Sequence, residues 1–442
     1  MSLASIVLVE PCLAQVVEKA KSVEMATQFW LQGYKSTAES LLKKVVNKFP
    51  DDLNTRTDLA QLLVEQKKYK EALPYVSYVL TINPYNRMAR ICRATIYDKT
   101  AAPAKALVDL LALRKFWGLR LEDQYLLANT LARLGRKQES DIEFGKSEKL
   151  KQVEPGHTKL RKEVLDLVRM ASSDKAIAKL DRLAADNPRD YYYDYLKAGI
   201  YKSLNKPEGV IQLCTKLLSR YQLKPESIGS TEVFRTYEMR GFAYAEIGQN
   251  QKALADLTKH LSLYPGDDGV YIFRAGVYNG LGQYSKALQD LKYVERIGSR
   301  FSRRDGYAMM SALYMKLGKD QEALKVWEKG FLEGDNSAMH RRASYHADRK
   351  EWPAAVEDLS RLLVVQKNVP SVLVDRGIAY SHLGKLDLAL KDLTKAVNSD
   401  PKRSKRARRE RARIYDRLGK SDLARKDRDI ASKQTGDNTM DF

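Results

Sequence analysis

The chain has 442 residues, of which 44% are hydrophobic and 30% charged, and this composition is ample for a folded protein. No apolar run approaches the roughly 18 residues that a membrane span requires, so we expect no integral membrane segment. The formal net charge of +21 leaves acidic proteins and polyanions open as partners, although charge says nothing about the fold.

The N-terminal residues 1–18 form a leader that allows two interpretations. The apolar run LASIVLV is followed by Cys12-Leu13-Ala14, a candidate small-residue cleavage site, but no Lys or Arg precedes it. One interpretation is an export signal clipped at its start, which would make the protein exported or periplasmic. The other is the first apolar helix of a cytoplasmic protein. We prefer the export signal.

From residue 19 onward, a pattern of small and large side chains recurs about every 34 residues. The clearest unit is FRTYEMRGFAYAEIGQNQKALADLTKHLSLYPGD, which spans 234–267. In this unit, Gly241 and Tyr244 share one helical face, and Gly248 breaks that helix before a second helix begins. Small residues such as Gly241 and Ala253 let two helix backbones approach closely, and the large residue fills the groove between them.

The same pattern can be followed through twelve units that cover residues 19–432. The units begin at Lys19, Leu53, Arg87, Leu121, His157, Tyr191, Phe234, Asp268, Arg304, Asn336, Pro370 and Lys405. This helix–turn–helix repeat resembles the tetratricopeptide repeat (TPR) family. The resemblance implies an all-α, right-handed solenoid of about twelve repeats, whose first helices line a concave groove that holds the ligand.

Two connections depart from the regular spacing. The joint KLKQVEPG before the unit at His157 is slightly too long, and LKPESIGSTEV lengthens the connection before Phe234. The second segment contains Pro, Gly and Ser, which favour an irregular connection. We therefore predict an N-terminal sub-array at 19–222, a hinge at 223–233, a C-terminal sub-array at 234–432 and a frayed tail at 433–442.

An arginine just before the first small residue is followed by an aspartate 16 positions later in six of the units. The pairs are Arg93 with Asp109, Arg240 with Asp256, Arg274 with Asp290, Arg342 with Asp358, Arg376 with Asp392, and Arg411 with Asp427. We predict an ion pair between helices for each, within the repeat or with a neighbour, because a guanidinium can bond a carboxylate bidentately. The alternative is that these arginines contact a ligand.

Catalytic, cofactor and metal motifs are missing from the sequence. The cysteines Cys12, Cys92 and Cys214 are too widely spaced for a metal site, and His340 and His346 do not have the i, i+4 spacing of paired ligands. No phosphate-cradling loop, GxSxG or HExxH occurs. His260 occupies a regular packing position. The sequence therefore predicts a protein that is not an enzyme and has no cofactor and no metal.

The TPR resemblance implies that the second, fifth, ninth and twelfth residues of each unit face the groove. Tyr192 and Tyr195 occupy such positions, with Lys202 further along the same helix. Tyrosines are typical of protein-binding surfaces, but packing between repeats would explain them equally well.

The last unit is strongly basic, with 13 basic and 4 acidic residues between positions 402 and 428. Arg406, Arg409 and Arg413 fall on the expected groove, and Arg341 joins the same side. The cluster is consistent with a solvated cap of the solenoid, with a site for an acidic peptide or protein tail, or with nucleic-acid binding. The third is the least favoured, because Tyr415 is the lone aromatic residue in the cluster.

Some TPR domains clamp the C-terminal carboxylate of heat-shock chaperones with a lysine–asparagine pair in one unit, an asparagine in the next and a lysine–arginine pair in the third. That set is absent, and Glu238 and Phe242 stand where the unit at Phe234 would need the lysine and asparagine. We conclude that the chain is a scaffold or adaptor that binds a partner protein or peptide. The alternative is a polyanion- or RNA-binding solenoid.

Overall fold

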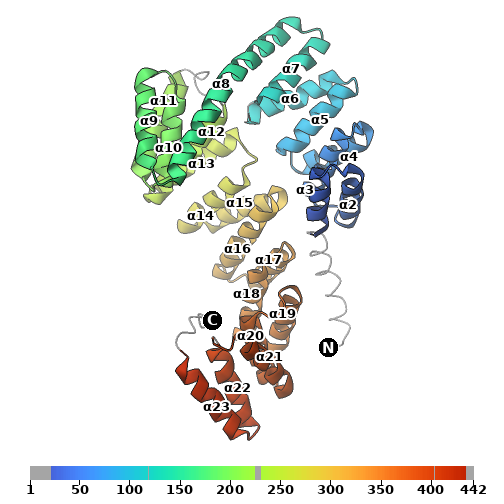
Figure 1. The fold of residues 1–442 in the computed structure, drawn as a ribbon, viewed down its shortest axis with the longest axis vertical. Helices are drawn as coiled ribbons and strands as arrows, with labels where there is room; N and C mark the ends of the chain where they lie inside the picture. The colour runs from blue at the N-terminus through green and yellow to red at the C-terminus, as the bar shows by residue number, and fades with distance from the viewer. Residues whose placement is uncertain (1–20, 118, 224–229, 403, 435–442) are drawn as a thin grey trace. The chain divides into compact units, whose positions relative to one another are not determined.

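The computed structural model describes residues 21–117, 119–223, 230–402 and 404–434, and within these ranges every regular element is a helix (Figure 1). The predicted leader at 1–18 lies outside the described residues, and so do residues 435–442 of the predicted tail. The last helix ends at Lys433. No helix of the described ranges combines the length and hydrophobicity that crossing a membrane requires.

The described chain forms two compact units, 22–302 and 303–442. The helices of the first unit follow residues 21–31, which are also helical. They are α2 (Lys35–Lys48), α3 (Leu53–Glu65), α4 (Tyr69–Ile82), α5 (Arg87–Lys99), α6 (Pro103–Trp117), α7 (Leu121–Arg133), α8 (Lys137–Arg169), α9 (Ser173–Asp186), α10 (Tyr192–Ser203), α11 (Pro207–Leu223), α12 (Ser230–Glu246), α13 (Asn250–Leu263), α14 (Asp268–Gly280) and α15 (Tyr284–Ile297).

The helices of the second unit begin with α16, whose first residues precede the division at Arg303. They are α16 (Arg300–Lys316), α17 (Asp320–Leu332), α18 (Asn336–Asp348), α19 (Trp352–Val365), α20 (Pro370–His382), α21 (Leu386–Ser399), α22 (Lys405–Arg417) and α23 (Ser421–Lys433). Successive helices pair in the order that the repeat predicts, so the expected all-α architecture of helix–turn–helix units is present.

Each pair is held together at its small residues. Gly377 of α20 lies so close to α21 that an added Cβ would come within 2.9 Å of Leu393 Cγ. At Gly241 of α12 the corresponding distance to Leu257 is 3.1 Å. Other units place alanine at this position, as at Ala60 and Ala94, where the side chain is fully buried. The packing of the two backbones thus explains the small residues of the repeat.

The turn within each pair needs a residue in the left-handed region. Gly248 has φ +75°, and the N–H groups of Gly248 and Gln249 donate to the carbonyls of Ala245 and Tyr244 in a C-terminal cap. Units without glycine take the same turn with a non-glycine residue, for instance Lys67 at φ +61° and Lys350 at φ +60°. Those units carry a conformational cost of about 1 kcal/mol.

The predicted joint KLKQVEPG is wrong, because α8 continues through it as one helix of 33 residues. This helix supplies both the second helix of one unit and the first helix of the next. Residues 149–154 favour a helix, but Pro155 and Gly156 disfavour one, so local propensity alone does not account for the continuity of α8.

The predicted boundary at 223–233 is not where the compact units divide, since that division lies between Ser302 and Arg303. Residues 224–229 are outside the described ranges, and α12 already begins at Ser230. Tyr237 of α12 packs in one hydrophobic cluster with Leu217 and Leu218 of α11. Shared apolar burial therefore joins the two helices across the predicted hinge.

Candidate functional site

In the unit 303–442, the first helices of three consecutive pairs bring polar side chains into a row. Asp375 of α20 lies between His340 of α18 and Arg406 of α22. The Asp375 carboxylate accepts a hydrogen bond from His340 Nε2 at 2.7 Å. It also forms an ion pair with Arg406 Nη1 at 2.8 Å. All three side chains are between 21% and 30% exposed, so they remain accessible to a ligand.

A cavity of about 210 Å³ opens beside this row. Its apolar lining comes from small and aliphatic side chains, and Trp352 at the start of α19 forms one wall, stacked on His382 at 4.0 Å. The lining residues are His340, Ala343, Ser344, Ala347, Asp348, Trp352, Ala355, Leu359, Asp375, Ile378, Ala379 and Arg406. We call this the first-helix cavity.

The predicted groove arginines lie on or near this face. Arg406 lines the first-helix cavity, whereas Arg409 and Arg413 are exposed further along α22. Arg413 pairs with Glu410 at 2.7 Å, and its side chain is still 72% exposed. Arg341 is exposed and donates to Ser337 Oγ, but it does not line the cavity.

Sequence reasoning missed His340, Asp375 and Trp352. His340 is the fifth residue of its unit, so the rule for groove positions would have found it. Asp375 and Trp352 lie outside those positions, and only the packing of the neighbouring helices shows where they point.

The interpretation of Tyr192 and Tyr195 as groove residues is wrong for Tyr192, which is only 8% exposed. Its ring stacks on His157 of α8 at 4.0 Å and on Tyr195 at 6.0 Å. Tyr195 packs against the clusters of α11 and α12, and burial raises its pKa to about 12. The contacts of Tyr192 and Tyr195 therefore fit the alternative interpretation, in which both rings pack between repeats. Lys202 is exposed, with its ammonium 4.7 Å from the Phe242 ring.

All six arginines of the 16-residue pattern bond the aspartate that follows them. In Arg274, Nε donates to Asp290 Oδ2 at 2.8 Å and Nη2 to Oδ1 at 2.7 Å, and the other five pairs have the same bidentate arrangement. Every aspartate is at most 6% exposed. The hydrogen bond to Asp427 raises the pKa of Arg411 above its ordinary value.

The guanidinium also reaches the preceding pair of helices, which the sequence did not indicate. Arg274 Nη1 donates to Thr258 Oγ1 of α13 at 3.0 Å, and Arg376 Nη1 donates to Ser360 Oγ of α19 at 3.1 Å. Each of these arginines therefore joins three helices, and its hydrogen-bonding groups are used within the protein rather than offered to a ligand.

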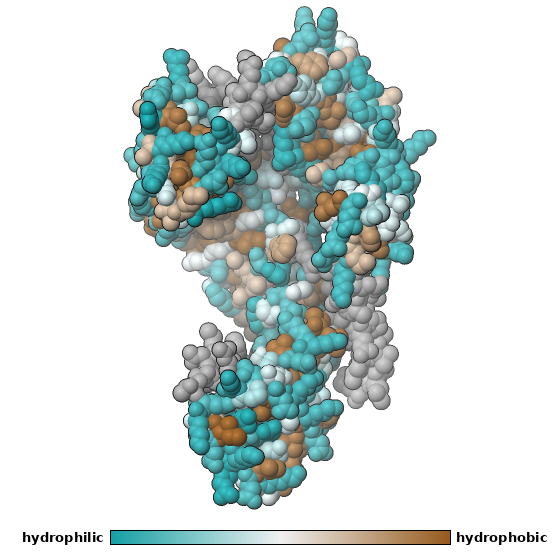
Figure 2. Space-filling model, viewed as in Figure 1, coloured by the Kyte–Doolittle hydropathy of each residue, from teal (hydrophilic) through white to brown (hydrophobic). Residues whose placement is uncertain are grey.

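Several basic residues in the last repeat pair with its acidic side chains, and others bond the preceding helix pair. Arg408 and Arg411 both bond Asp427, Arg428 pairs with Asp416, and Arg425 with Asp422. Arg417 donates to Ser381. Figure 2 shows mostly hydrophilic side chains over α22 and α23, with small hydrophobic patches between them.

The buried thiols have no surroundings that would activate them. Burial raises the pKa of Cys92 and of Cys214 to about 12, so both stay protonated at neutral pH and pack as small hydrophobic groups. Cys12 lies outside the described residues.

Comparison with known proteins places these helix pairs in a known class of repeat. Residues 342–413, which include most of the first-helix cavity, match the family model of the tetratricopeptide repeat. No curated protein matches the sequence. The chain is all-α and built of helix–turn–helix pairs that carry this repeat pattern along its length. The match to the tetratricopeptide repeat covers residues 342–413, and the other helix pairs share its helix–turn–helix arrangement.

Solved structures with a similar arrangement have low sequence identity. The Cut9–Hcn1 heterotetramer of the APC/C matches with 13% identity and a TM-score of 0.30, covering 96% of this chain and 94% of that one. Yeast Tom70 matches with 12% identity, a TM-score of 0.32 and coverages of 94% and 92%. YrrB, described as a TPR protein with an unusual peptide-binding site, matches with 18% identity, a TM-score of 0.33 and coverages of 41% and 93%.

TPR scaffolds generally mediate interactions between proteins and are in general not enzymes.

Proposed function

We propose that the chain is a non-catalytic scaffold that binds a partner protein or peptide at the first-helix cavity. The observation that carries this proposal is an apolar cavity bordered by the hydrogen-bonded row of His340, Asp375 and Arg406. Small-molecule sites usually enclose about 300–1,000 Å³. A cavity of about 210 Å³ is better suited to one side chain that projects from a larger partner.

The charges around the cavity favour an acidic partner. Arg409 and Arg413 are exposed on α22, and Arg341 is exposed on α18. These guanidinium groups can bond carboxylates that flank an apolar anchor in the ligand. The expected ligand is therefore a peptide segment with one large apolar residue and neighbouring Asp or Glu.

The alternative of a polyanion or RNA ligand has less support. Many cations of the last unit already neutralise aspartates or glutamates of the same unit, as in Arg411 with Asp427. Residues 402–428 still hold 13 basic against 4 acidic residues, so the weaker support rests on Tyr415 being the lone aromatic side chain there that could stack on a base. Binding that depends on several phosphates would collapse between low and moderate salt, whereas binding of one apolar anchor would be affected far less.

The test uses a displayed library of random peptides selected on the full chain. Ala347→Trp fills the first-helix cavity from α18 without removing any member of the polar row. Lys391→Ala, on the second helix α21, is the matched control. We expect selected peptides with an apolar anchor and acidic flanks, at least tenfold weaker binding to Ala347→Trp and unchanged binding to Lys391→Ala. Equal binding to both variants would show that the cavity is not the site.

A further inference from the structure

His260 of α13 has a fixed tautomer. Its side chain is fully buried, and Nδ1 lies 2.8 Å from the carbonyl oxygen of Phe234. A carbonyl can only accept, so Nδ1 carries the hydrogen and donates it. In the neutral ring, Nε2 is then left with a lone pair. This Nδ1–H to backbone carbonyl contact is the arrangement that orients histidine ligands of metals.

The Nε2 lone pair faces a second acceptor. Asp267 Oδ2 is 3.1 Å from Nε2, while Asp267 Oδ1 accepts the backbone N–H of Val270 as the N-cap of α14. Two acceptor atoms at this distance repel each other unless a cation lies between them. That cation is either a proton on His260 or a metal ion.

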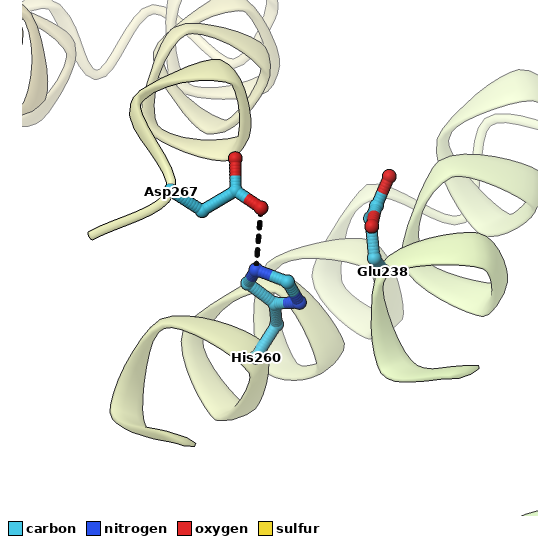
Figure 3. A group of neighbouring side chains, drawn as sticks. All are labelled: Glu238, His260 and Asp267. Carbon is cyan, nitrogen blue, oxygen red and sulfur yellow. Dashed lines mark hydrogen bonds and ion pairs between the residues drawn. The ribbon is translucent and has the colours of Figure 1, made fainter. Parts of the chain in front are cut away.

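Glu238 supplies a third ligand group from α12. Its carboxylate, His260 Nε2 and the Asp267 carboxylate all lie within 4.8 Å of one another (Figure 3). Figure 3 shows the Asp267 carboxylate, from the connection before α14, pointing at the His260 ring, with Glu238 on a neighbouring helix. The Glu238 and Asp267 side chains are about three-quarters buried, at 24% and 25% exposure. Solvent therefore screens their charges only partly.

The charge around the group leaves room for a cation. Lys202 lies 3.9 Å from Glu238 Oε1 and the charge of Arg235 also acts on Glu238, but neither lies between the two carboxylates and the imidazole as a bound ion would. A divalent ion would offset the repulsion between the two carboxylates more fully than Lys202 does.

We propose that Glu238, His260 and Asp267 bind a divalent transition-metal ion, with zinc as the best fit to one imidazole and two carboxylates. Zinc takes nitrogen at about 2.0–2.1 Å and oxygen at about 2.0–2.2 Å in a tetrahedron, which separates its ligand atoms by roughly 3.3 Å. The 3.1 Å between Nε2 and Oδ2 fits this spacing, and a Glu238 carboxylate oxygen lies within 4.8 Å of both atoms. The fourth position goes to water.

The ion would act as a cross-link between repeats. Glu238 and His260 belong to the pair α12–α13, whereas Asp267 caps α14, the first helix of the next pair. Metal binding thus stabilises the contact between two neighbouring units. This role is independent of the proposed peptide site, because all three ligands lie within the unit 22–302.

Other histidine–carboxylate contacts serve as internal controls. His157 with Asp190 and His340 with Asp375 each form a pair, and in the described part of the chain neither pair belongs to a group of three candidate ligands. Asp190→Asn therefore removes a similar contact without touching the proposed metal site.

The test treats the full-length chain with a chelator and titrates it with Zn²⁺ at pH 7 by calorimetry, and with Co²⁺ by visible absorption. We expect one ion per chain and a rise in Tm with metal. Glu238→Gln and Asp267→Asn should each weaken binding by roughly tenfold or more, whereas Asp190→Asn should not. Asn at 267 can still cap α14, so this variant keeps the fold.

Three results would overturn the proposal. One is no stoichiometric uptake of Zn²⁺ or Co²⁺ by the folded chain. Another is affinity that Glu238→Gln and Asp267→Asn leave unchanged, with folding checked by circular dichroism. The third is a ¹⁵N NMR spectrum in which Nε2 of His260 stays protonated in excess Zn²⁺, which would identify the cation as a proton.

Discussion

The two compact units use the same position of the repeat in opposite ways. Tyr192, the second residue of its unit, is 8% exposed and stacks on His157. Arg406 is the second residue of the repeat that begins at Lys405, in the compact unit 303–442. Its side chain is 30% exposed and lines the first-helix cavity. The position within the repeat is the same, but a flat ring can be buried between helices whereas a guanidinium keeps contact with water. Side-chain chemistry therefore decides which groove positions become a binding surface.

The units also differ in their long-range contacts. In 22–302, the turn before α5 meets segments that are far away in the sequence: Asn83 donates to the carbonyl of Ile297 at 3.3 Å, and Tyr85 shares a hydrophobic cluster with Tyr264. In 303–442, a cavity remains open beside the first helices. The described contacts between distant segments therefore belong to 22–302, whereas the described cavity beside the first helices belongs to 303–442.

The bidentate arginine–aspartate pairs 16 residues apart, which we call the arginine ladder, occur in both compact units. Removing one of these aspartates should have the largest effect on stability. Asp392→Ala leaves Arg376 with its bond to Ser360 but without its carboxylate, and we expect a loss of about 3 kcal/mol in unfolding free energy. Asp290→Ala, in the compact unit 22–302, should lower the unfolding free energy by the same amount within about 1 kcal/mol, because Arg274 has the same contacts. Urea unfolding followed by circular dichroism measures both.

A loss below about 1 kcal/mol in either variant would contradict the ladder's structural role, since that is the value of an exposed ion pair. Asp392→Asn keeps one acceptor for Arg376 and should cost less than Asp392→Ala.

The pH dependence of stability tests whether Tyr195 is buried in the compact unit 22–302. The pKa of Tyr195 is raised by burial to about 12, compared with about 10 in the unfolded chain. The neutral phenol is thus favoured by folding, so its contribution to stability is complete below pH 10 and is lost as pH rises from about 10 to 12. This corresponds to about 3 kcal/mol. Burial also raises the pKa of Tyr293, so ultraviolet titration should show late-titrating tyrosines whose number falls by one in Tyr195→Phe.

If Tyr195 instead lined an open groove, it would titrate near pH 10 with the exposed tyrosines. That result would remove the contrast between the two units.

The sequence predicted the elements better than the surfaces. Gly241, Gly377 and their equivalents set the helix pairs, because a small residue at the closest approach of two backbones is a strict steric demand. The 16-residue arginine–aspartate spacing likewise predicted contacts that need only helix geometry. The first-helix cavity depends on side chains from α18, α19, α20 and α22 together, and neither the repeat period nor the Pro155-Gly156 pair in the sequence indicated the continuous α8.

The glycine contacts predict a graded cost between the units. At Gly377, a Cβ would lie 2.9 Å from Leu393 Cγ and 3.4 Å from the carbonyl of Ala389, so Gly377→Ala requires a shift of the two helices. At Gly241 the nearest atoms of Leu257 are 3.1 Å away, and a small adjustment of that side chain suffices. We expect Gly377→Ala to cost about 1–2 kcal/mol and Gly241→Ala less, as measured by thermal unfolding. A reversed order would show that α20 and α21 adapt more easily than their spacing implies.

The smallest expected effect is a gain in stability at the turns that lack glycine. Lys350 has φ +60° and Lys67 has φ +61°, one in each unit, and glycine takes this conformation without the Cβ clash. Relief of about 1–2 kcal/mol of strain is offset by the greater freedom of glycine in the unfolded chain. Lys350→Gly and Lys67→Gly should therefore each raise stability by roughly 0.5 kcal/mol, while Gly384→Ala, at φ +71°, should lower it. A gain confined to one unit would show that the turns, and not only the groove residues, differ between the two parts of the chain.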